Sequence, residues 1–549
     1  MPEAIGLAIL GASLAAEVGA TVTFAVGAVT LGIVSTGLSF AIQALTPKPK
    51  RPALSALEGT TVMARGSNEP HQVVYGERVV SGPVLLLAAS GADNEFLHII
   101  VALAGHEVED IGDVWLGDTL SDDARFTGYV RINKHLGADD QEADEDLVAE
   151  VDGWTEDHRL RGIAYVYVRL KFASSVWLSG IPNIKAQVKG RKLYDPRTET
   201  TAYSANAALC QRDYLTAAFG IEESTANMHE ASWIAAANIC DEEVELAVGG
   251  TQPRYECNGT FTLDRRPIDV MEGLLSASQG TVIYTAGQYR GYAAAYDVPD
   301  PGTPDLTADD LRGEVTLTAH AAMRDACNTI RGTFADAANY YQLTDFPPVT
   351  NAQYIAEDGG EELVREIELP YTTNAPAAQR LAKIGLERSR QKALNFPAKL
   401  GALRHSAWDT VPVTLPQLGA AWNGQVCRVG SLGFSPDGGI DLSLVTEDPA
   451  VYAWDAEETA LDTPPAIGTP DPHAVADPTN VAFDIEAVVN ADGSTNAFLR
   501  VTWDRPTDKF VTSGGQAEVR AYSQDPGTGD QATGGQDHGV GEAGDSDNF

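Results

Sequence analysis

The sequence predicts a β-rich α+β protein of several domains. Its 549 residues exceed what one hydrophobic core usually holds, because domains commonly contain about 100–200 residues. Apolar runs broken by Gly and Asn recur in residues 71–120, 161–172 and 426–445, as expected for strands and hairpins. Helical patterns gather between these runs. Together these features favour β domains joined by an α+β region.

The N-terminal segment, residues 1–46, is predicted to be apolar and helical. Residues 5–45 contain a single charge, Glu17, and glycines at spacings that suit close helix packing. Residues 22–45 are long enough to span a bilayer as a helix. Two alternatives stay open: helices in a membrane, or helices buried in a large assembly. The Pro- and Lys-rich residues 47–60 are expected to form a stiff linker.

Residues 61–194 are expected to form a first β domain with an insertion. Strands are predicted at 79–80, 84–87, 97–101 and 161–172, and the last of these alternates so that one face is more apolar. The insertion contains the acidic run 139–146. We interpret this run as a solvated loop or helix face and not as a metal site.

Residues 195–300 are expected to form an α+β middle domain. Ser204 can cap a helix that runs to about residue 219, and a second helix is predicted at 229–240. A third begins at Pro267, a residue suited to a first turn, and ends at Gly280. A hairpin around residues 286–287 follows it.

Residues 301–455 are expected to form a second β domain that includes an amphipathic helix at 375–394. Asn374 can cap this helix, and Pro376 lies in its first turn. Its basic residues either pair with acidic neighbours or form a docking face for another subunit. A hairpin is predicted with its turn at 435–439.

The C-terminal part is expected to contain three segments. Residues 456–478 are rich in Pro and acidic residues and read as a linker. Residues 479–522 resemble the first strands of a β-sandwich, with Trp503 as an inward anchor. Residues 523–549 are rich in Gly and Asp and are expected to be disordered.

Charge and cysteine content limit the function classes. The chain has 38 basic and 77 acidic residues, a net charge of −39, so we expect no site that binds DNA or RNA. An acidic proteome would explain the same charge. The five cysteines, which form no CxxC pair, are expected to be buried reduced thiols, and this fits assembly in a cytosol.

No motif of an enzyme stands out. The sequence contains no GxSxG, P-loop, GxGxxG or zinc signature. Glu230 could be a general acid. However, it lies at the start of a predicted helix, where the helix dipole stabilises a carboxylate, and this explains the residue without a catalytic role. We therefore nominate no catalytic, cofactor-binding or metal-ligating residue, and we expect a protein without a cofactor that is not an enzyme.

Six stretches together carry a resemblance to a known family. They include "NEFLHIIVALAGHEVEDIGDVWLGD", "RYECNGTFTLDRRPIDVMEGLLSASQG" and "GQVCRVGSLGFSPDGGIDLSLVTEDPAVYAWD". The others are residues 180–215, 231–242, and 327–351 with 378–391 behind them. In this order, from about residue 60 to 455, the chain resembles the tail tip attachment proteins of lambda-like siphophages. These are also called host specificity protein J or central tail hub proteins.

The resemblance implies a structural hub at the distal tip of the tail, in a virion assembled in the host cytoplasm. It implies a homotrimer in which each chain contributes two tube-type β-barrel domains, residues 61–194 and 301–455. The six barrels of the trimer would then adapt the sixfold symmetry of the tube to the threefold symmetry of the tip. Residues 479–522 would be a partial fibronectin type III module. Such a hub would contact the distal tail protein, other tail tip or baseplate proteins, the tape measure protein and a tip fibre or receptor-binding protein.

The resemblance also implies a role in DNA ejection. Genome DNA would pass through the lumen without specific binding, and residues 5–45 would plug the lumen or contact the host membrane. Two other functions remain as alternatives. One is a receptor-binding adhesin of the tail tip, and the other is a membrane-anchored bacterial surface protein.

Overall fold

The fold is described from a computed structural model. It describes residues 63, 69–173, 176–177, 180–319, 326–435, 438–455, 457–461, 479–489, 491–493, 495–504, 516–521, 536–542 and 547–548. The chain divides into two compact units, Met1–Leu461 and Asp462–Phe549. The predictions for residues 1–46 and 47–60, and for most of 456–478, lie outside the described residues. The predicted fold class, a β-rich α+β chain of several domains, is confirmed.

The first β domain contains two four-stranded sheets. One has the order β2 (Glu77–Val80), β9 (Ile184–Lys189), β5 (Asp110–Leu116), β6 (Thr119–Leu120). The other has the order β3 (Val84–Ser90), β4 (Phe96–Ala104), β8 (Ala164–Lys171), β7 (Val130–His135). Both sheets contribute apolar side chains to one core, which includes Ile99, Val168 and Val188.

Strand β8 is buried on both faces, which differs from the expectation of one apolar face. Val166 and Val168 lie in the main core of the domain, whereas Tyr165 and Tyr167 lie in a smaller cluster with Leu147. Leu147 belongs to helix α3 (Glu145–Glu150), which forms part of the insertion. The insertion therefore covers the second face of the sheet, and an alternating sequence pattern could not reveal this.

The acidic run 139–146 is only partly solvated. Asp144 is buried, caps α3 through the Leu147 N–H, and accepts hydrogen bonds from Asn133 and His135, each at 2.8 Å. Burial alone would raise the pKa of Asp144, but the hydrogen bonds from His135 and Asn133 outweigh it and lower the pKa. The interpretation as a solvated run is thus wrong at this residue, because α3 needs a capping side chain that faces the sheet.

The middle of the chain contains the predicted helices. They are α4 (Ala207–Thr216), α5 (Glu230–Cys240) and α6 (Pro267–Ser276), followed by the hairpin β15 (Thr281–Thr285) and β16 (Gln288–Tyr292). Ala286 and Gly287 connect the two strands with φ values of 51° and 79°, which suit a tight hairpin turn. Three strand pairs complete this region: β1 (Gln72–Tyr75) with β14 (Gly259–Thr262), β10 (Lys192–Asp195) with β11 (Thr200–Tyr203), and β12 (Glu243–Glu245) with β13 (Thr251–Pro253).

A six-stranded sheet forms the second β domain. Its order is β17 (Leu306–Thr307), β24 (Thr410–Thr414), β25 (Asn423–Ser435), β26 (Gly439–Thr446), β23 (Ala393–Ala398), β18 (Thr316–Thr318). The predicted hairpin is the pair β25 and β26. The core of this sheet is separate from the other cores and includes Phe396, Val413 and Leu442.

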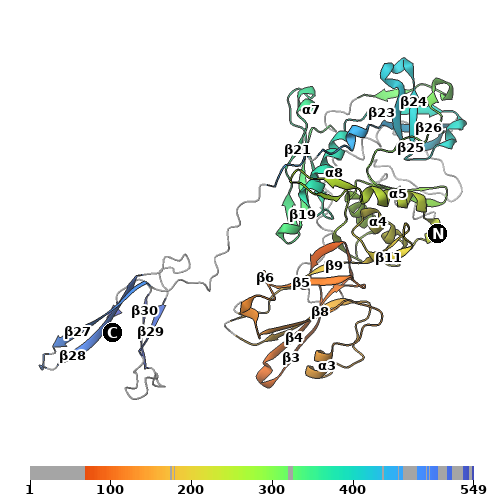
Figure 1. The fold of residues 1–549 in the computed structure, drawn as a ribbon. Helices are drawn as coiled ribbons and strands as arrows, with labels where there is room; N and C mark the ends of the chain where they lie inside the picture. The colour runs from red at the N-terminus through yellow and green to blue at the C-terminus, as the bar shows by residue number, and fades with distance from the viewer. Residues whose placement is uncertain are drawn as a thin grey trace. The chain divides into compact units, whose positions relative to one another are not determined.

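Residues 327–388 differ from the predicted domain division. They form β19 (Thr329–Asp336), β20 (Gln342–Asp345), β21 (Val349–Thr350), α7 (Ala352–Glu357), β22 (Val364–Leu369) and α8 (Ala375–Arg388). Their side chains Ile330, Phe334 and Leu381 share a core with Trp233 and Leu274 of the middle helices. This shared core, here called the central core, crosses the boundary expected at residue 300. In Figure 1 the helices α4, α5 and α8, which contribute to this core, lie between the sheets of the first β domain and the six-stranded sheet.

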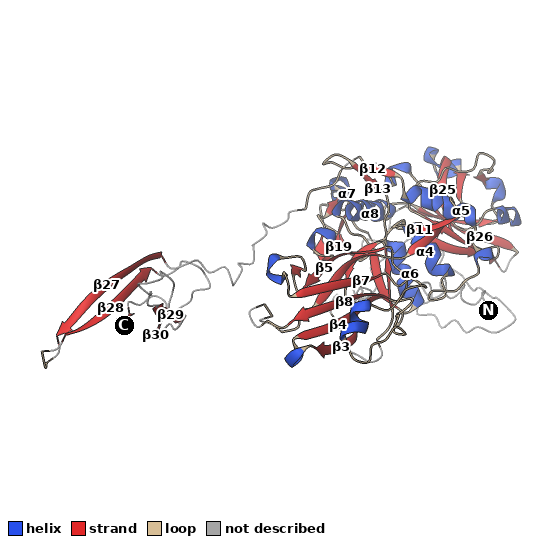
Figure 2. Ribbon diagram, turned by 60° about the horizontal axis from the view of Figure 1, so that its bottom comes forward, coloured by secondary structure: helices blue, strands red, loops and turns tan. Residues whose placement is uncertain are grey.

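Helices gather at the central core, and strands predominate elsewhere in the described chain (Figure 2). Within the described residues, no helix is both long enough and apolar enough to cross a membrane. The sheets of the first β domain and the six-stranded sheet thus flank a mixed α+β body.

The second unit is built from strands. β27 (Thr479–Val489) pairs with β28 (Thr495–Asp504), as expected for residues 479–522, and β31 (Asp547–Asn548) joins them. β29 (Gln516–Ala521) pairs with β30 (Gln536–Glu542). β30 and β31 lie within residues 523–549, where we expected disorder. Strand pairing uses backbone groups, so a Gly-rich sequence carries little signal for it. The side chain of Trp503 lies outside the described residues.

Candidate functional site

A polar cavity of about 460 Å³ opens where the first β domain meets the central core. Its lining residues come from five segments of the chain. These are β2, the end of β11 with the loop that follows it, the segment before β14, the turn before β20 and the loop before α8. The polar ones are Glu77, Tyr203, Ser204, Glu256, Asn258, Tyr341 and Thr373. Segments far apart along the chain, from Glu77 to Thr373, thus converge on one hollow.

Asn258 fixes the geometry of the cavity wall. Its Oδ1 accepts from the Glu77 N–H at 2.8 Å, and its Nδ2 donates to Thr373 Oγ1 at 3.1 Å. The chain reaches this contact through Gly76, whose φ is +61° and whose position has no room for a Cβ beside Asn258. Glycine adopts such a conformation readily, so the Gly76–Glu77 sequence lets β2 begin against the wall.

Glu77 is held by two donors. Gln187 Nε2 on β9 donates to its Oε1, and the Tyr341 hydroxyl donates to the same oxygen at 3.3 Å. Burial, followed by the charge of Glu77, raises the pKa of Tyr341. Tyr341 is therefore a neutral phenol at ordinary pH, and the charge of Glu77 is fixed at the edge of the cavity.

Glu256 lies across the same cavity and is partly buried. Its segment is positioned by the Cys257 N–H, which donates to Ala205 O at 2.7 Å, and by a bridge between Asn206 and Glu256. Within the described part of the chain, no hydrogen bond reaches its carboxylate. Burial raises the pKa of Glu256, the charge of Glu77 raises it further, and Arg380 lowers it. The net direction is upward, because burial and the charge of Glu77 outweigh Arg380, whose hydrogen bond goes to Arg254 O.

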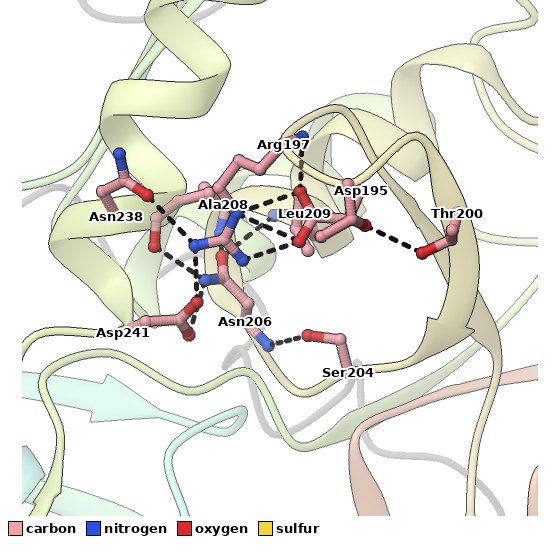
Figure 3. A network of polar contacts seen from close by, with 11 residues as sticks. Asp195, Arg197, Thr200, Ser204, Asn206, Ala208, Leu209, Asn238 and Asp241 are labelled. Atoms are coloured by element: carbon pink, nitrogen blue, oxygen red, sulfur yellow. Dashed lines mark hydrogen bonds and ion pairs between the residues drawn. The ribbon is translucent and has the colours of Figure 1, made fainter.

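A dense polar network supports the cavity from behind, at the start of α4 (Figure 3). Asn206 caps α4 by accepting from the Ala208 and Leu209 N–H groups, and it donates to Asp241 at 2.8 Å and to Ala237 O at 2.9 Å. We expected Ser204 to be this cap. Ser204 Oγ instead accepts from the Asn206 N–H at 3.1 Å.

Arg197 completes this network. Its guanidinium bonds Asp195 at 2.8 Å and Asp241 at 2.7 Å, so it ties the turn between β10 and β11 to the end of α5 (Figure 3). Burial alone would raise the pKa of Asp195, but the hydrogen bonds from Arg197 outweigh it and lower the pKa. Arg197 therefore keeps the Asp195 carboxylate ionised, whereas burial raises the pKa of Glu256 in the cavity.

The cavity therefore presents two carboxylates, Glu77 and Glu256, from distant segments of the chain. Within the described residues, no group of three or more His, Cys, Asp or Glu side chains is arranged to hold a metal ion. Sequence reasoning nominated no residue of this cavity, because Glu77 and Glu256 stand in ordinary contexts far apart along the chain. Glu230, the carboxylate that we weighed and set aside, pairs with Arg212 at 2.5 Å at the start of α5.

The basic residues of α8 and of the segment after it act within the fold. Lys383 pairs with Glu457 at 2.8 Å, Arg390 pairs with Asp358, and Arg380 is buried. The interpretation that these charges pair with acidic neighbours is confirmed for Lys383 and Arg390. The five cysteines are buried and unpaired, as expected.

Comparisons with known proteins give one partial family match and one match in fold. Residues 266–429 match the model of a family described as putative phage tail protein. The chain is also similar in fold to a chain of the virion of a native gene transfer agent particle. That match has a TM-score of 0.53 and 18% identity, and it covers 81% of this chain and 98% of that chain. The family match and this fold support a structural component of a phage tail.

Two further structures show weaker similarity. One is the 43 kDa tail protein of prophage MuSo2 from Shewanella oneidensis, with a TM-score of 0.25 and 11% identity over 70% of this chain and 99% of that chain. The other is the prophage tail protein gp18 from Listeria monocytogenes EGD-e, with a TM-score of 0.24 and 11% identity over 66% of this chain and 88% of that chain.

Proposed function

We propose that this protein is the hub at the distal tip of a phage tail. In this role it forms a trimeric ring that closes the tail tube, anchors tip fibres and opens for DNA ejection. The observation that carries the proposal is the fold match to a chain of a virion particle, which spans 98% of that chain, together with the phage tail family match at residues 266–429.

The division into cores supports a symmetry-adapting role. Each chain carries two β domains with separate cores, and both are attached to the central core. Three chains would present six β domains at the tip, so a threefold ring could meet a sixfold tube. The central core would set the spacing between the two β domains, because its side chains come from residues 73 to 452.

The net charge of −39 supports passage of DNA without adhesion. Phosphates and carboxylates repel each other, so a bore lined by such a protein would not retain the genome. The partners in this role are a distal tail protein, other tail tip proteins, the tape measure protein and a tip fibre, and residues 5–45 would contact the host membrane.

Electron microscopy of purified tails tests this proposal. We expect threefold density of this chain at one end of the tail, and we expect particles that lack the chain to have open or unassembled tips. Density repeated along the tube, or a single copy per particle, would contradict the ring.

We also propose that the chain is a structural protein and not an enzyme. The sequence contains no GxSxG, P-loop, GxGxxG or zinc signature, which is why we nominate no catalytic residue. Incubation of the purified chain with peptidoglycan tests this, and release of soluble fragments would contradict it.

A further inference from the structure

We propose that one side of α8 is a docking site for an extended acidic peptide, which a second copy of this chain supplies. The chain's own residues 453–455 and 457–461, here called the strap, occupy this site. The sequence from residue 453 to residue 461 is AWDAEETAL, which contains three acidic residues and no basic one. The inference does not depend on the hub proposal, because it requires only that two copies of the chain lie side by side.

Side chains of α8 bind the backbone of the strap. Gln379 donates its Nε2 to Thr459 O and accepts from the Thr459 N–H, both at 2.9 Å. Lys383, one turn further along the same face of α8, donates to Ala453 O at 3.0 Å. Every peptide carries such backbone groups, and main-chain hydrogen bonds of this kind give affinity for extended peptides. The site therefore has the means to bind a strap that another chain supplies.

The charges of the strap and of α8 are complementary. Lys383 pairs with Glu457 at 2.8 Å. The ring centroid of Trp454 lies 6.0 Å from the guanidinium carbon of Arg380 and 5.8 Å from Lys383 Nζ, which is within the range of cation–π attraction. Glu458 accepts from the Ala247 N–H beside the helix. The site thus suits an acidic peptide with an aromatic anchor.

Buried polar atoms without partners show that the strap fits the site incompletely. Arg380 is 1% exposed, and its Nε makes no hydrogen bond. Its terminal nitrogens meet neutral oxygens, those of the Arg254 backbone and of the Gln252 amide. In the strap, Trp454 Nε1 and the Oε2 atom of Glu458 are also buried without a partner. Burial lowers the pKa of Arg380 to about 10, so a cation without a bonded carboxylate lies beside a carboxylate oxygen without a donor.

The incomplete fit has a physical cause in the connection of the strap. Val451 and Tyr452, directly before it, are buried in the central core and fix where each strap side chain falls along α8. A strap from a second copy is not fixed at this point, so its Glu458 carboxylate can bond Arg380 and neutralise the buried charge. Within the described strap, Leu461 alone packs against the central core, so the chain's own strap can leave without opening that core.

A synthetic peptide with the sequence of residues 452–461 tests the site, and fluorescence anisotropy of a label at its N-terminus measures binding. In the natural full chain the strap competes at an effective concentration in roughly the millimolar range, so the peptide should bind weakly. Trp454→Ala combined with Thr459→Pro weakens the strap without changing α8, because proline has no N–H for Gln379. The affinity for the peptide should then rise at least about tenfold.

Further variants in this background tie the binding to α8. Lys383→Met removes the charge that pairs with Glu457 and should reverse most of the gain. Lys392→Met removes an exposed charge after α8 and should leave the affinity unchanged. A peptide with glutamine in place of Glu457 and Glu458 should bind more weakly. Thermal unfolding verifies the fold of each variant. An unchanged affinity in the variant with the weakened strap, or in Lys383→Met, would overturn the site.

Carbodiimide coupling of the natural chain tests whether a second copy supplies the strap. The reagent joins an ammonium to a neighbouring carboxylate as an amide, so it should couple Lys383 to Glu457. In a mixture of unlabelled and heavy-isotope-labelled chains, mass spectrometry should find coupled peptides with both labels at this pair. Lys192 and Glu107, which also lie 2.8 Å apart, should give products with one label only. Products with one label only at Lys383 and Glu457 would overturn the second copy as the source.

Discussion

At Glu256, the raised pKa means that the folded protein holds a proton on this carboxyl more tightly than the unfolded chain does. The ionised carboxylate therefore destabilises the fold at neutral pH, and this destabilisation fades as pH falls through the raised pKa. We predict that Glu256→Gln increases the free energy of unfolding at pH 7–8, because burial and then the charge of Glu77 disfavour the ionised carboxylate.

Thermal unfolding at several pH values checks this prediction. The gain in melting temperature should shrink as pH falls toward 4, because the natural carboxyl is then protonated. Glu245→Gln should show little gain at any pH. A loss of stability in Glu256→Gln at pH 8 would mean that the carboxylate has a favourable partner in the folded chain.

The N-terminal cap of α4 is Asn206, two residues after Ser204, the cap that we expected from the sequence. Ser204 and Asn206 are both good capping residues, so the local sequence does not decide between them. The choice comes from Asp241 and Ala237 O, which accept from the Asn206 amide and lie 35 and 31 residues away along the chain.

We predict that Asn206→Ala costs about 2–3 kcal/mol, more than an ordinary cap, because a buried carbonyl also loses its donor. Asn351→Ala is the matched comparison, since Asn351 caps the short helix α7, which buries no residue. It should cost about 1 kcal/mol or less. Chemical denaturation of both variants measures the difference, and equal losses would show that the contacts with Asp241 and Ala237 contribute little.

At the scale of elements, local signals predicted most of the helices and hairpins of the middle and second β domains. Pro267 begins α6, Asn374 caps α8 through the Ala377 N–H, and Ala286–Gly287 turns the hairpin β15–β16. These signals are local because a cap or a turn involves only a few adjacent residues. The other two-stranded sheets of the first unit were not predicted. Their strands are short, and β1 pairs with β14 almost two hundred residues later.

Strand β14 illustrates how a neighbour far along the chain fixes an element. A Cβ at Gly259 would lie 1.5 Å from the ring of Tyr371, so the ring rests directly on the strand backbone. We predict that Gly259→Ala costs about 3 kcal/mol or more through overpacking. Gly433→Ala in β25 has open space around its Cβ and should change stability little. Denaturation curves compare the two, and similar midpoints would contradict the close packing.

At the scale of the whole first unit, one buried ion pair connects the six-stranded sheet to the central core. Arg428 of β25 bonds Glu447 at 2.9 Å and donates to Ala295 O at 3.3 Å, and the Tyr452 hydroxyl also bonds Glu447. Tyr452 belongs to the central core. The pair therefore spans the junction, and both of its side chains are only 8% exposed.

We predict that Arg428→Met costs about 3–5 kcal/mol, because it leaves Glu447 buried without its cation. The matched control is Arg331→Met, which breaks an ion pair with Glu362 whose side chains are 51% and 47% exposed. That change should cost at most about 1 kcal/mol. Equal effects in thermal unfolding would show that the junction does not depend on this pair.

The domain division and the polar cavity could not be predicted, for the same physical reason. A core is defined by contacts between side chains, and the central core joins Trp233 to Phe334 and Leu381 across the expected boundary at residue 300. Likewise Tyr341 reaches Glu77 over 264 positions. Composition and periodicity report the environment of a residue but not which distant segment supplies it.

The shared core leads to a prediction about fragments. A fragment of residues 63–461 retains all three main cores and should fold as a stable protein that resists limited proteolysis.

A fragment of residues 63–300 ends at the boundary that the sequence favoured, and it lacks Ile330, Phe334, Leu381 and Ile384 from the central core. Loss of these buried side chains exposes the apolar faces of the middle helices, and each costs about 2–5 kcal/mol by analogy with large-to-alanine changes. The total of about 8–20 kcal/mol is as large as the usual stability of a domain, about 5–15 kcal/mol. The shorter fragment should therefore be digested in its middle region while the first β domain survives, and a protease-resistant fragment of full length would show that residues 195–300 form a core of their own.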